Sequence, residues 1–324
     1  MTDLTRRAFG VLLAGTAAAA MIPASARAEA MLSSLELLAP SSPGSGYDQL
    51  ARAVQGVLQS KGLVSAVEVV NVAGGGGTVG LAQFVTTRPR KPTALIVGFA
   101  LVGGVLSTQS AVTLKDVTPI ARLMGDVDAI VVPASSDIKT LADLVAKLKE
   151  NPGAVSWAGG SIGGVDHVTA GLFAKAAGVD PTAINYVVHA GGGEVLASVL
   201  GGHATVGISG YEEFRAQVDS GDLRALAVSG ETRIEGVDVP TFKESGIDLA
   251  VQNWRGIVAN PRMKDADRDA LTAAIAEMVK SPEWAEALKT RGWIDSYQPA
   301  DEFGAFLTEE TTRIGQALKD AGVL

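Results

Sequence analysis

The sequence predicts an α/β protein of two lobes, each a mostly parallel sheet flanked by helices, with a ligand cleft between the lobes. Short apolar, β-branched runs alternate with amphipathic helical segments, as in βαβ units. Several runs end in glycine-rich turns, and 38 glycines with only 5% aromatic residues suit tight layers with many turns. A chain of 324 residues that is 47% apolar is long enough for one large or two medium domains.

The first lobe begins with repeated strand–turn–helix units. Leu50, Val54, Val57 and Leu58 share one face of the first helix, at helical spacing. Asp48 stands where an N-cap or first-turn carboxylate would stand, and Arg52 lies four residues later, so we expect these two to pair. The expected strands cover 35–39, 67–72 and 95–99, and the expected helices cover 47–61 and 79–86.

A second series of strands and helices follows an extended apolar passage. Helix 136–150 opens this series, and two long helices, 265–280 and 300–318, close the chain. Expected strands cover 154–158, 184–188, 206–209, 224–229 and 250–259. We place the crossings between lobes near 126–133 and 222–229. Lobe 1 is then discontinuous, with residues 29–130 and 225–324, and lobe 2 comprises 131–224.

The N-terminus predicts a signal peptide of the twin-arginine type over residues 1–28. Arg6 and Arg7 precede an apolar run at 11–22, and the sequence Ala-Arg-Ala at 26–28 resembles a cleavage site. The apolar run is too short for a comfortable membrane span. We expect export to the periplasm and cleavage near Ala28.

Composition argues against several classes of partner and cofactor. Residues 1–28 contain three arginines and one aspartate, so the remaining chain carries a formal charge of −10. That charge disfavours nucleic acid and anionic membranes as partners. The absence of cysteine excludes disulfides and thiolate nucleophiles, and three histidines argue against a His-rich metal site. We expect no metal and no cofactor.

Four glycine-rich turns, at 40–48, 71–78, 157–167 and 189–194, supply the candidate binding site. Each stands between an expected strand and an expected helix. The first amides of such a helix are unpaired and its dipole favours an anion. We therefore expect main-chain amides, rather than lysines, to hold a carboxylate ligand. The candidate ligand-binding residues are Ser42, Ser45, Gly46, Tyr47, Asp48, Gly75, Gly76, Gly77, Thr78, Gly160, Ser161, Gly164, Asp166, His167, His189, Gly191, Gly192, Gly193, Tyr211, Trp254 and Arg255.

Two of these turns also match motifs of other functions. Residues 75–80 fit the dinucleotide pattern G-x-G-x-x-G, but no Asp or Glu occurs from Val69 to Lys115, so the ribose-binding acid is missing. Residues 159–163 fit the hydrolase pattern G-x-S-x-G, with Ser161 as nucleophile. His189 and His203 follow it more closely than the hydrolase order requires. An exported serine hydrolase using Ser161 remains the alternative function.

Several single residues have both a structural and a ligand-binding interpretation. Asp166 and His167 either cap a helix or contact the ligand. Trp254 is either a core residue or part of the cleft, and Arg255 pairs either with a ligand carboxylate or with a structural acid such as Asp48. Tyr211, which follows an expected strand, is a further candidate for the cleft.

The chain resembles the extracytoplasmic solute receptors of tripartite tricarboxylate transporters, the TctC or Bug family. The resemblance lies in PGSGYDQLAR, NVAGGGGTVGLA, GGSIGGVDH, YVVHAGGGE, GISGYEE and NWRG, in that order. It implies a type II periplasmic-binding-protein fold, without enzyme activity, that closes on a small organic polycarboxylate such as a citrate-like tricarboxylate or a dicarboxylate. It also implies delivery of that ligand to integral membrane permease subunits. Ser45 departs from the glycine that many members carry there.

We expect a monomeric receptor in which ligand binding shifts a hinge equilibrium toward a closed form, and a membrane partner that recognises this closed form. A ligand sensor that docks to a signalling protein would have the same sequence features, so it stays open beside the permease partner.

Overall fold

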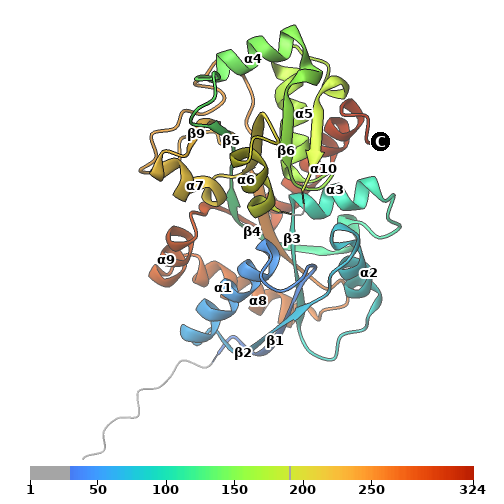
Figure 1. The fold of residues 1–324 in the computed structure, drawn as a ribbon. Helices are drawn as coiled ribbons and strands as arrows, with labels where there is room; N and C mark the ends of the chain where they lie inside the picture. Colours follow the sequence, from blue (N-terminus) through green and yellow to red (C-terminus); the bar gives the residue numbers. More distant parts are fainter. Residues whose placement is uncertain (1–29, 190) are drawn as a thin grey trace, which may run out of the picture.

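The computed structural model describes residues 30–189 and 191–324, and the expected signal peptide lies outside these residues. The described chain forms two separate sheets flanked by helices (Figure 1). We call the parts built on them lobe 1 and lobe 2. Within the described ranges, no helix is both long and apolar enough to cross a membrane.

Lobe 1 contains a six-stranded sheet in the order β11-β4-β10-β3-β1-β2. Its strands β1, β2, β3 and β4 run in one direction, and β10 and β11 run in the other. All six residues of β3 are buried, as expected of a central strand covered on both faces. The strands are β1 (Leu32–Ala39), β2 (Val64–Asn71), β3 (Thr93–Gly98), β4 (Thr118–Asp126), β10 (Asn253–Ala259) and β11 (Ile294–Pro299).

Lobe 2 contains a five-stranded sheet in the order β7-β6-β8-β5-β9. Here β5 is the strand that runs against its neighbours. The strands are β5 (Asp128–Pro133), β6 (Ser156–Gly159), β7 (Asn185–Val188), β8 (Val206–Gly210) and β9 (Leu223–Val228). The expected α/β fold of two sheets flanked by helices is confirmed. Both sheets are mixed, because a reversed strand, β10 or β5, lies between the third and fourth forward strands of each, and β11 is a second reversed strand at the edge of the lobe 1 sheet.

The helices flank both sheets. In lobe 1 they are α1 (Gly46–Ser60), α2 (Thr78–Thr86), α3 (Phe99–Ser107), α8 (Asp265–Met278), α9 (Pro282–Thr290) and α10 (Ala300–Asp320). In lobe 2 they are α4 (Leu141–Glu150), α5 (Val165–Ala176), α6 (Gly192–Leu200) and α7 (Tyr211–Ser220). Of these, α1, α2, α3, α5, α6 and α7 each follow a forward strand. Helix α10 packs on α3 and β4, and its end reaches α5 of lobe 2 (Figure 1).

The chain crosses between the sheets at Val127 and returns between Val228 and Asn253. The expected divisions after residues 130 and 224 fall inside β5 and β9, because both strands pair in the lobe 2 sheet over their full length. We propose that the lobe boundaries lie at Val127 and in the segment 229–252.

Buried apolar clusters hold each lobe. One cluster surrounds the lobe 1 sheet and includes Trp254 and Trp284, both fully buried. Two clusters cover the two faces of the lobe 2 sheet, and Trp157 packs there against Phe173 with ring centroids 5.8 Å apart. The three tryptophans each bury a large apolar area, which is the main stabilising contribution of such side chains.

N-cap residues determine where two of the helices begin. Helix α4 begins at Leu141 rather than at the expected residue 136, because Thr140 and Asp143 form a capping box. Helix α9, which we did not expect, begins with Ser281 as N-cap and Pro282 in the first turn. Strand β11 then pairs with β4.

Candidate functional site

Two adjoining cavities lie between the lobes, at the carboxyl ends of the forward strands. The first, which we call the turn cavity, has a volume of about 480 Å³ and is lined mainly by residues 40–47 and 73–77. The second, the acidic cavity, has a volume of about 410 Å³ and is lined by residues of both lobes. Gly46, Asn253 and Arg255 line both, so the cavities meet at these residues.

The cavities bring together residues from all four predicted turns. Expected site residues that line the turn cavity are Ser42, Ser45, Gly46, Tyr47, Gly75, Gly76, Gly77, Ser161 and Arg255. Those that line the acidic cavity are Gly46, Asp166, Gly191, Gly192, Tyr211 and Arg255. Expected residues outside both linings are Asp48, Thr78, Gly160, Gly164, His167, His189, Gly193 and Trp254.

Asp48 holds the first turn, at 40–48, in place through the hydrogen bonds of its carboxylate. Its buried carboxylate accepts hydrogen bonds from the Gly44 amide (2.8 Å), Arg52 Nε (2.9 Å) and Asn71 Nδ2 (3.0 Å). Ser45 is the N-cap of α1. The expected pair between Asp48 and Arg52 is confirmed. Burial alone would raise the pKa of Asp48, but the hydrogen bonds from Arg52, Gly44 and Asn71 outweigh burial and lower it below the ordinary value of 3.8.

We predict that Asp48→Ala lowers the free energy of unfolding by about 2–3 kcal/mol at pH 7, because the hydrogen bonds that Gly44, Asn71 and Arg52 donate to this buried carboxylate are lost. Since the pKa of Asp48 is lower in the folded state, its contribution is present above pH 4 and is lost as the pH falls through the folded pKa. Urea titrations of wild type and variant at pH 7 and pH 3 measure this difference. A difference that does not shrink at pH 3 would contradict the role of the charge.

The second turn, at 71–78, contains four consecutive glycines, and each of them has a positive φ angle, which favours glycine. The φ angles of Gly74, Gly75, Gly76 and Gly77 are +132°, +57°, +64° and +98°. L-residues with a Cβ adopt such angles at a cost of about 1–2 kcal/mol each. The turn ends at the N-terminus of α2, beside the turn cavity. The hydroxyl of Thr78 donates to the Gly75 carbonyl (2.8 Å) and so supports the turn instead of facing the cavity.

A glycine pair in α3, which sequence reasoning missed, lies between turns of the two lobes. A Cβ on Gly104 would lie 3.0 Å from the Gly76 carbonyl oxygen, and a Cβ on Gly103 would overlap the carbonyl oxygen of Gly163. Two adjacent glycines disfavour a helix interior by roughly 1 kcal/mol each. Their presence in the apolar segment 99–107 was the available signal for a close approach.

Tyr47 supports α3 rather than offering its hydroxyl to the cleft. The hydroxyl oxygen accepts a hydrogen bond from the Leu101 amide at 2.9 Å, near the start of α3. Burial raises the pKa of Tyr47 to about 12, so the group stays neutral at physiological pH. The ring edge still lines the turn cavity.

Arg255 is the cation shared by both cavities. Its Nη1 atom lies 3.1 Å from Asp126 Oδ2, and its side chain is 12% exposed. A Cβ on Gly46 would lie 2.5 Å from Arg255 Nη2, so a side chain at this position would displace the guanidinium from its place at the start of α1. The structural acid is therefore Asp126, not Asp48, which Arg52 already occupies. Asp126 was not expected at the site.

The lobe 2 turns are occupied by the protein's own carboxylates. Asp166 accepts a hydrogen bond from the Gly160 amide at 2.8 Å. Glu213 Oε2 accepts one from Ser209 Oγ at 2.6 Å and lies so close to Gly192 that a Cβ there would overlap the carboxylate. The N-termini of α5 and α6 thus face internal anions, and the turns of lobe 1 are the ones left for a ligand.

Three expected residues take structural positions. His167 is buried, and its Nδ1 accepts from the Gly163 amide at 3.2 Å, so this nitrogen is not a donor to a ligand. Trp254 is a core residue, with Nε1 donating to Glu310 Oε2 at 2.7 Å. His189 is half-buried and its Nδ1 lies 2.9 Å from the Val187 carbonyl oxygen.

Across the parts of the chain that the structure describes, Ser161 has no hydrogen bond to a histidine, and no group of three or more His, Cys, Asp or Glu side chains lies close enough together to hold a metal ion.

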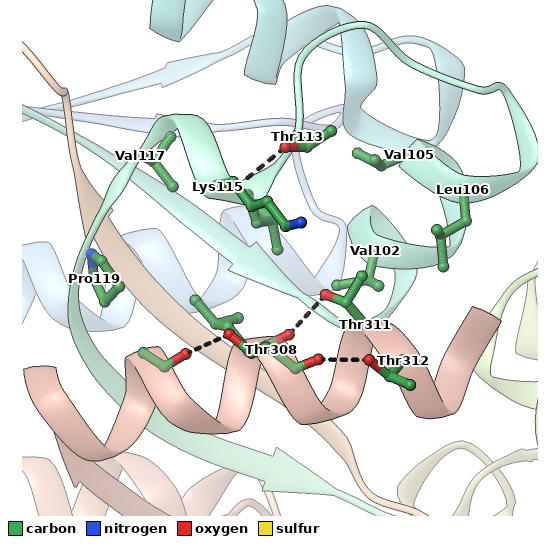
Figure 2. A pocket seen from close by; sticks show the side chains of 13 residues that line it. Val102, Val105, Leu106, Thr113, Lys115, Val117, Pro119, Thr308, Thr311 and Thr312 are labelled. Atoms are coloured by element: carbon green, nitrogen blue, oxygen red, sulfur yellow. Dashed lines mark hydrogen bonds between the residues drawn. The ribbon is translucent and has the colours of Figure 1, made fainter. Parts of the chain in front are cut away.

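Larger hollows lie on lobe 1 away from the turns, with volumes of about 550 and 750 Å³. Figure 2 shows the first, between α3 and α10. The hydroxyls of Thr308, Thr311 and Thr312 point along α10 and donate to carbonyls of their own helix, at 3.2, 2.6 and 3.1 Å. These three hydroxyl donors are therefore already used, and Lys115 adds a cationic side chain to this lining.

Comparisons with known proteins agree with this geometry. The family model described as "Tripartite tricarboxylate transporter family receptor" matches residues 50–323. Protein BugT of Bordetella pertussis is 26% identical, with 89% of each chain covered. The crystal structure of a TctC solute binding protein from Polaromonas is 27% identical with a TM-score of 0.75, covering 88% of this chain and 98% of that one. MatC from Rhodopseudomonas palustris with bound malate is 19% identical with a TM-score of 0.71, covering 89% and 99%.

Proposed function

Because the chain belongs to the family of tripartite tricarboxylate transporter receptors, we propose that it captures a small organic polycarboxylate and delivers it to the integral membrane subunits of such a transporter. Family and fold are those of periplasmic solute-binding receptors. The proposal includes the periplasm as location, the signal peptide of residues 1–28, a monomeric state, and no nucleic-acid partner.

The observation that carries the proposal is the turn cavity itself. A run of four left-handed glycines, the N-termini of α1 and α2, and the guanidinium of Arg255 surround one space of about 480 Å³. Main-chain amides and helix dipoles attract an anion without a lysine. A planar guanidinium is suited to a carboxylate.

Hydrogen bonds and helix dipoles of ordinary strength suffice to bind a ligand with micromolar affinity. Binding at 1 μM requires about 8 kcal/mol. Hydrogen bonds to a charged group contribute roughly 1.5–3 kcal/mol each and helix dipoles about 0.3–1 kcal/mol. Six to eight donors would supply this even after the entropic cost of association.

A di- or tricarboxylate of citrate or malate size fits this proposal. The structural neighbour MatC has bound malate, which supports a carboxylate ligand for the shared fold. Ser45, at the cavity wall, adds a hydroxyl where many family members have glycine, and we propose that it contributes to ligand choice.

A thermal-shift panel tests the proposed function. We expect at least one of citrate, isocitrate, tricarballylate, malate, succinate and aromatic dicarboxylates to raise the melting temperature by roughly 5 °C at 100 times its Kd. No stabilisation by any of them would contradict the proposal.

We further predict that Gly76→Val weakens binding of the best ligand at least tenfold and costs only about 1–2 kcal/mol of folding free energy, because a β-branched residue disfavours φ near +64°. Gly178→Val is the matched control, since Gly178 has φ +77° with open space around it and lines neither cavity. Isothermal titration and urea unfolding measure the two effects. Full ligand affinity in Gly76→Val would remove the second turn from the site.

A further inference from the structure

The hollow between α3 and α10 is separate from the cleft. It has a volume of about 550 Å³ and shares no lining residue with the turn cavity or the acidic cavity. Its wall comes from α3, α10 and the segment 113–119 at the start of β4 (Figure 2). A cavity of this volume with a mainly apolar wall is typical of small-molecule sites. The aliphatic residues of the wall, four of them buried, are Val102, Val105, Leu106, Leu114, Val117 and Leu307.

The polar side chains of this wall leave one strong hydrogen-bond donor free. The three threonine hydroxyls of α10 donate to carbonyls of their own helix, and the Thr113 hydroxyl donates to Asp116 Oδ2 at 3.2 Å. Lys115 is the charged residue of this lining, and its Nζ has no hydrogen bond or ion pair in the part of the chain that the structure describes. Figure 2 shows the Lys115 ammonium pointing toward the space between α3 and α10.

An aliphatic wall with one unpaired cation matches a particular kind of ligand. The wall favours a hydrocarbon chain, because burial removes apolar surface from water. A charge placed against aliphatic side chains without a partner is strongly disfavoured, so a di- or tricarboxylate, with charges at both ends, does not match. A single anionic end can meet Lys115, whose long apolar stem can follow the wall while its ammonium stays hydrated.

We propose that this hollow binds an amphipathic monoanion, a linear aliphatic chain that ends in one carboxylate. The carboxylate pairs with Lys115, and the chain packs against Val102, Val105 and Leu307. This goes beyond the proposed function, because the site, the ligand class and the contacting residues all differ from those of the cleft. Binding in the hollow does not depend on binding in the cleft, so either proposal can fail alone.

A chain-length series tests the apolar wall. We would titrate the purified protein at pH 7.5 with hexanoate, octanoate and decanoate by calorimetry, each below the concentration at which it forms micelles. We expect one saturable site whose Kd falls about tenfold for every two methylenes added, because each buried methylene contributes a similar free energy. No saturable binding of decanoate, or a Kd that does not depend on chain length, would overturn the proposal.

Decylammonium tests the charge of the ligand, because its chain also has ten carbons but its end is cationic. Residues 29–324 carry a formal charge of −10, so nonspecific adsorption would favour this cation over decanoate. In the hollow, its ammonium would meet Lys115 as a like charge. We therefore expect decylammonium to bind at least about fivefold more weakly than decanoate. Equal or tighter binding of decylammonium would overturn the proposal.

Three variants locate the bound chain. Lys115→Gln should raise the Kd of decanoate about fivefold and remove its preference over decylammonium. Lys149→Gln is the matched control, because Lys149 is likewise exposed and without an ion pair in the described ranges, but lies on α4 of lobe 2. Arg255→Gln should leave decanoate binding unchanged, since Arg255 lines the turn cavity and not this hollow. Wild-type affinity for decanoate in Lys115→Gln, or its loss in Arg255→Gln, would overturn the proposal.

Discussion

Arg255→Gln should weaken binding of the best carboxylate ligand by about 100-fold. The guanidinium is the cation that both cavities share, and its loss removes charge-assisted hydrogen bonds of about 1.5–3 kcal/mol. The loss also leaves Asp126, held at 3.1 Å from Arg255, as an unpaired negative charge beside the ligand. Isothermal titration of wild type and variant with the same ligand measures the change.

Two further variants separate these contributions. Asp126→Asn combined with Arg255→Gln removes the unpaired charge, so it should recover part of the lost affinity. Arg52→Gln is the control for loss of an arginine, because Arg52 pairs with Asp48 and lines neither cavity. An Arg255→Gln variant that binds within a factor of three of wild type would show that Arg255 acts on Asp126 alone and does not touch the ligand.

Gly103→Ala should weaken ligand binding at least tenfold without destabilising lobe 1. The new Cβ would overlap the Gly163 carbonyl oxygen, which belongs to the turn between β6 and α5 of lobe 2, so the lobes could not approach as they do here. Alanine favours the helix by up to about 1 kcal/mol over glycine, so α3 itself should gain stability. Titration with ligand, urea unfolding of the free protein and the radius of gyration from solution scattering measure these effects.

Gly56→Ala provides the matched control for this substitution. Gly56 is also inside a lobe 1 helix, but a Cβ there meets nothing within 4 Å, so affinity should not change. Wild-type affinity in Gly103→Ala would mean that the contact between Gly103 and Gly163 is absent from the ligand-bound arrangement.

Local signals in the sequence predicted the lobe 1 turns well. The spacing of Asp48 and Arg52 on one helix face sufficed for their ion pair, and the four glycines indicated a tight turn. Asp48 was expected at the N-cap or in the first turn, and the structure places it in the first turn with Ser45 as the N-cap. These features depend on neighbours within a few residues, and periodicity, capping and turn chemistry describe such neighbours directly.

Contacts between segments far apart in the sequence could not be predicted from these local patterns. Asp126 meets Arg255 across 129 positions of sequence, and Glu213 meets the Gly192 turn because β8 and α7 are folded beside α6. The alternatives for Trp254 and Arg255 stayed open for the same reason, since the partner of each side chain, Glu310 or Asp126, depends on the tertiary fold. Helix α9 was missed although Ser281 and Pro282 mark its start.

A crystal structure of the protein with the tightest ligand of the acid panel tests the central claim most directly. We predict a carboxylate of the ligand in the turn cavity, within hydrogen-bond distance of amides in Gly74–Gly77 and of the Arg255 guanidinium. A ligand found instead in the hollow between α3 and α10, or a nucleotide along residues 75–80, would contradict the account.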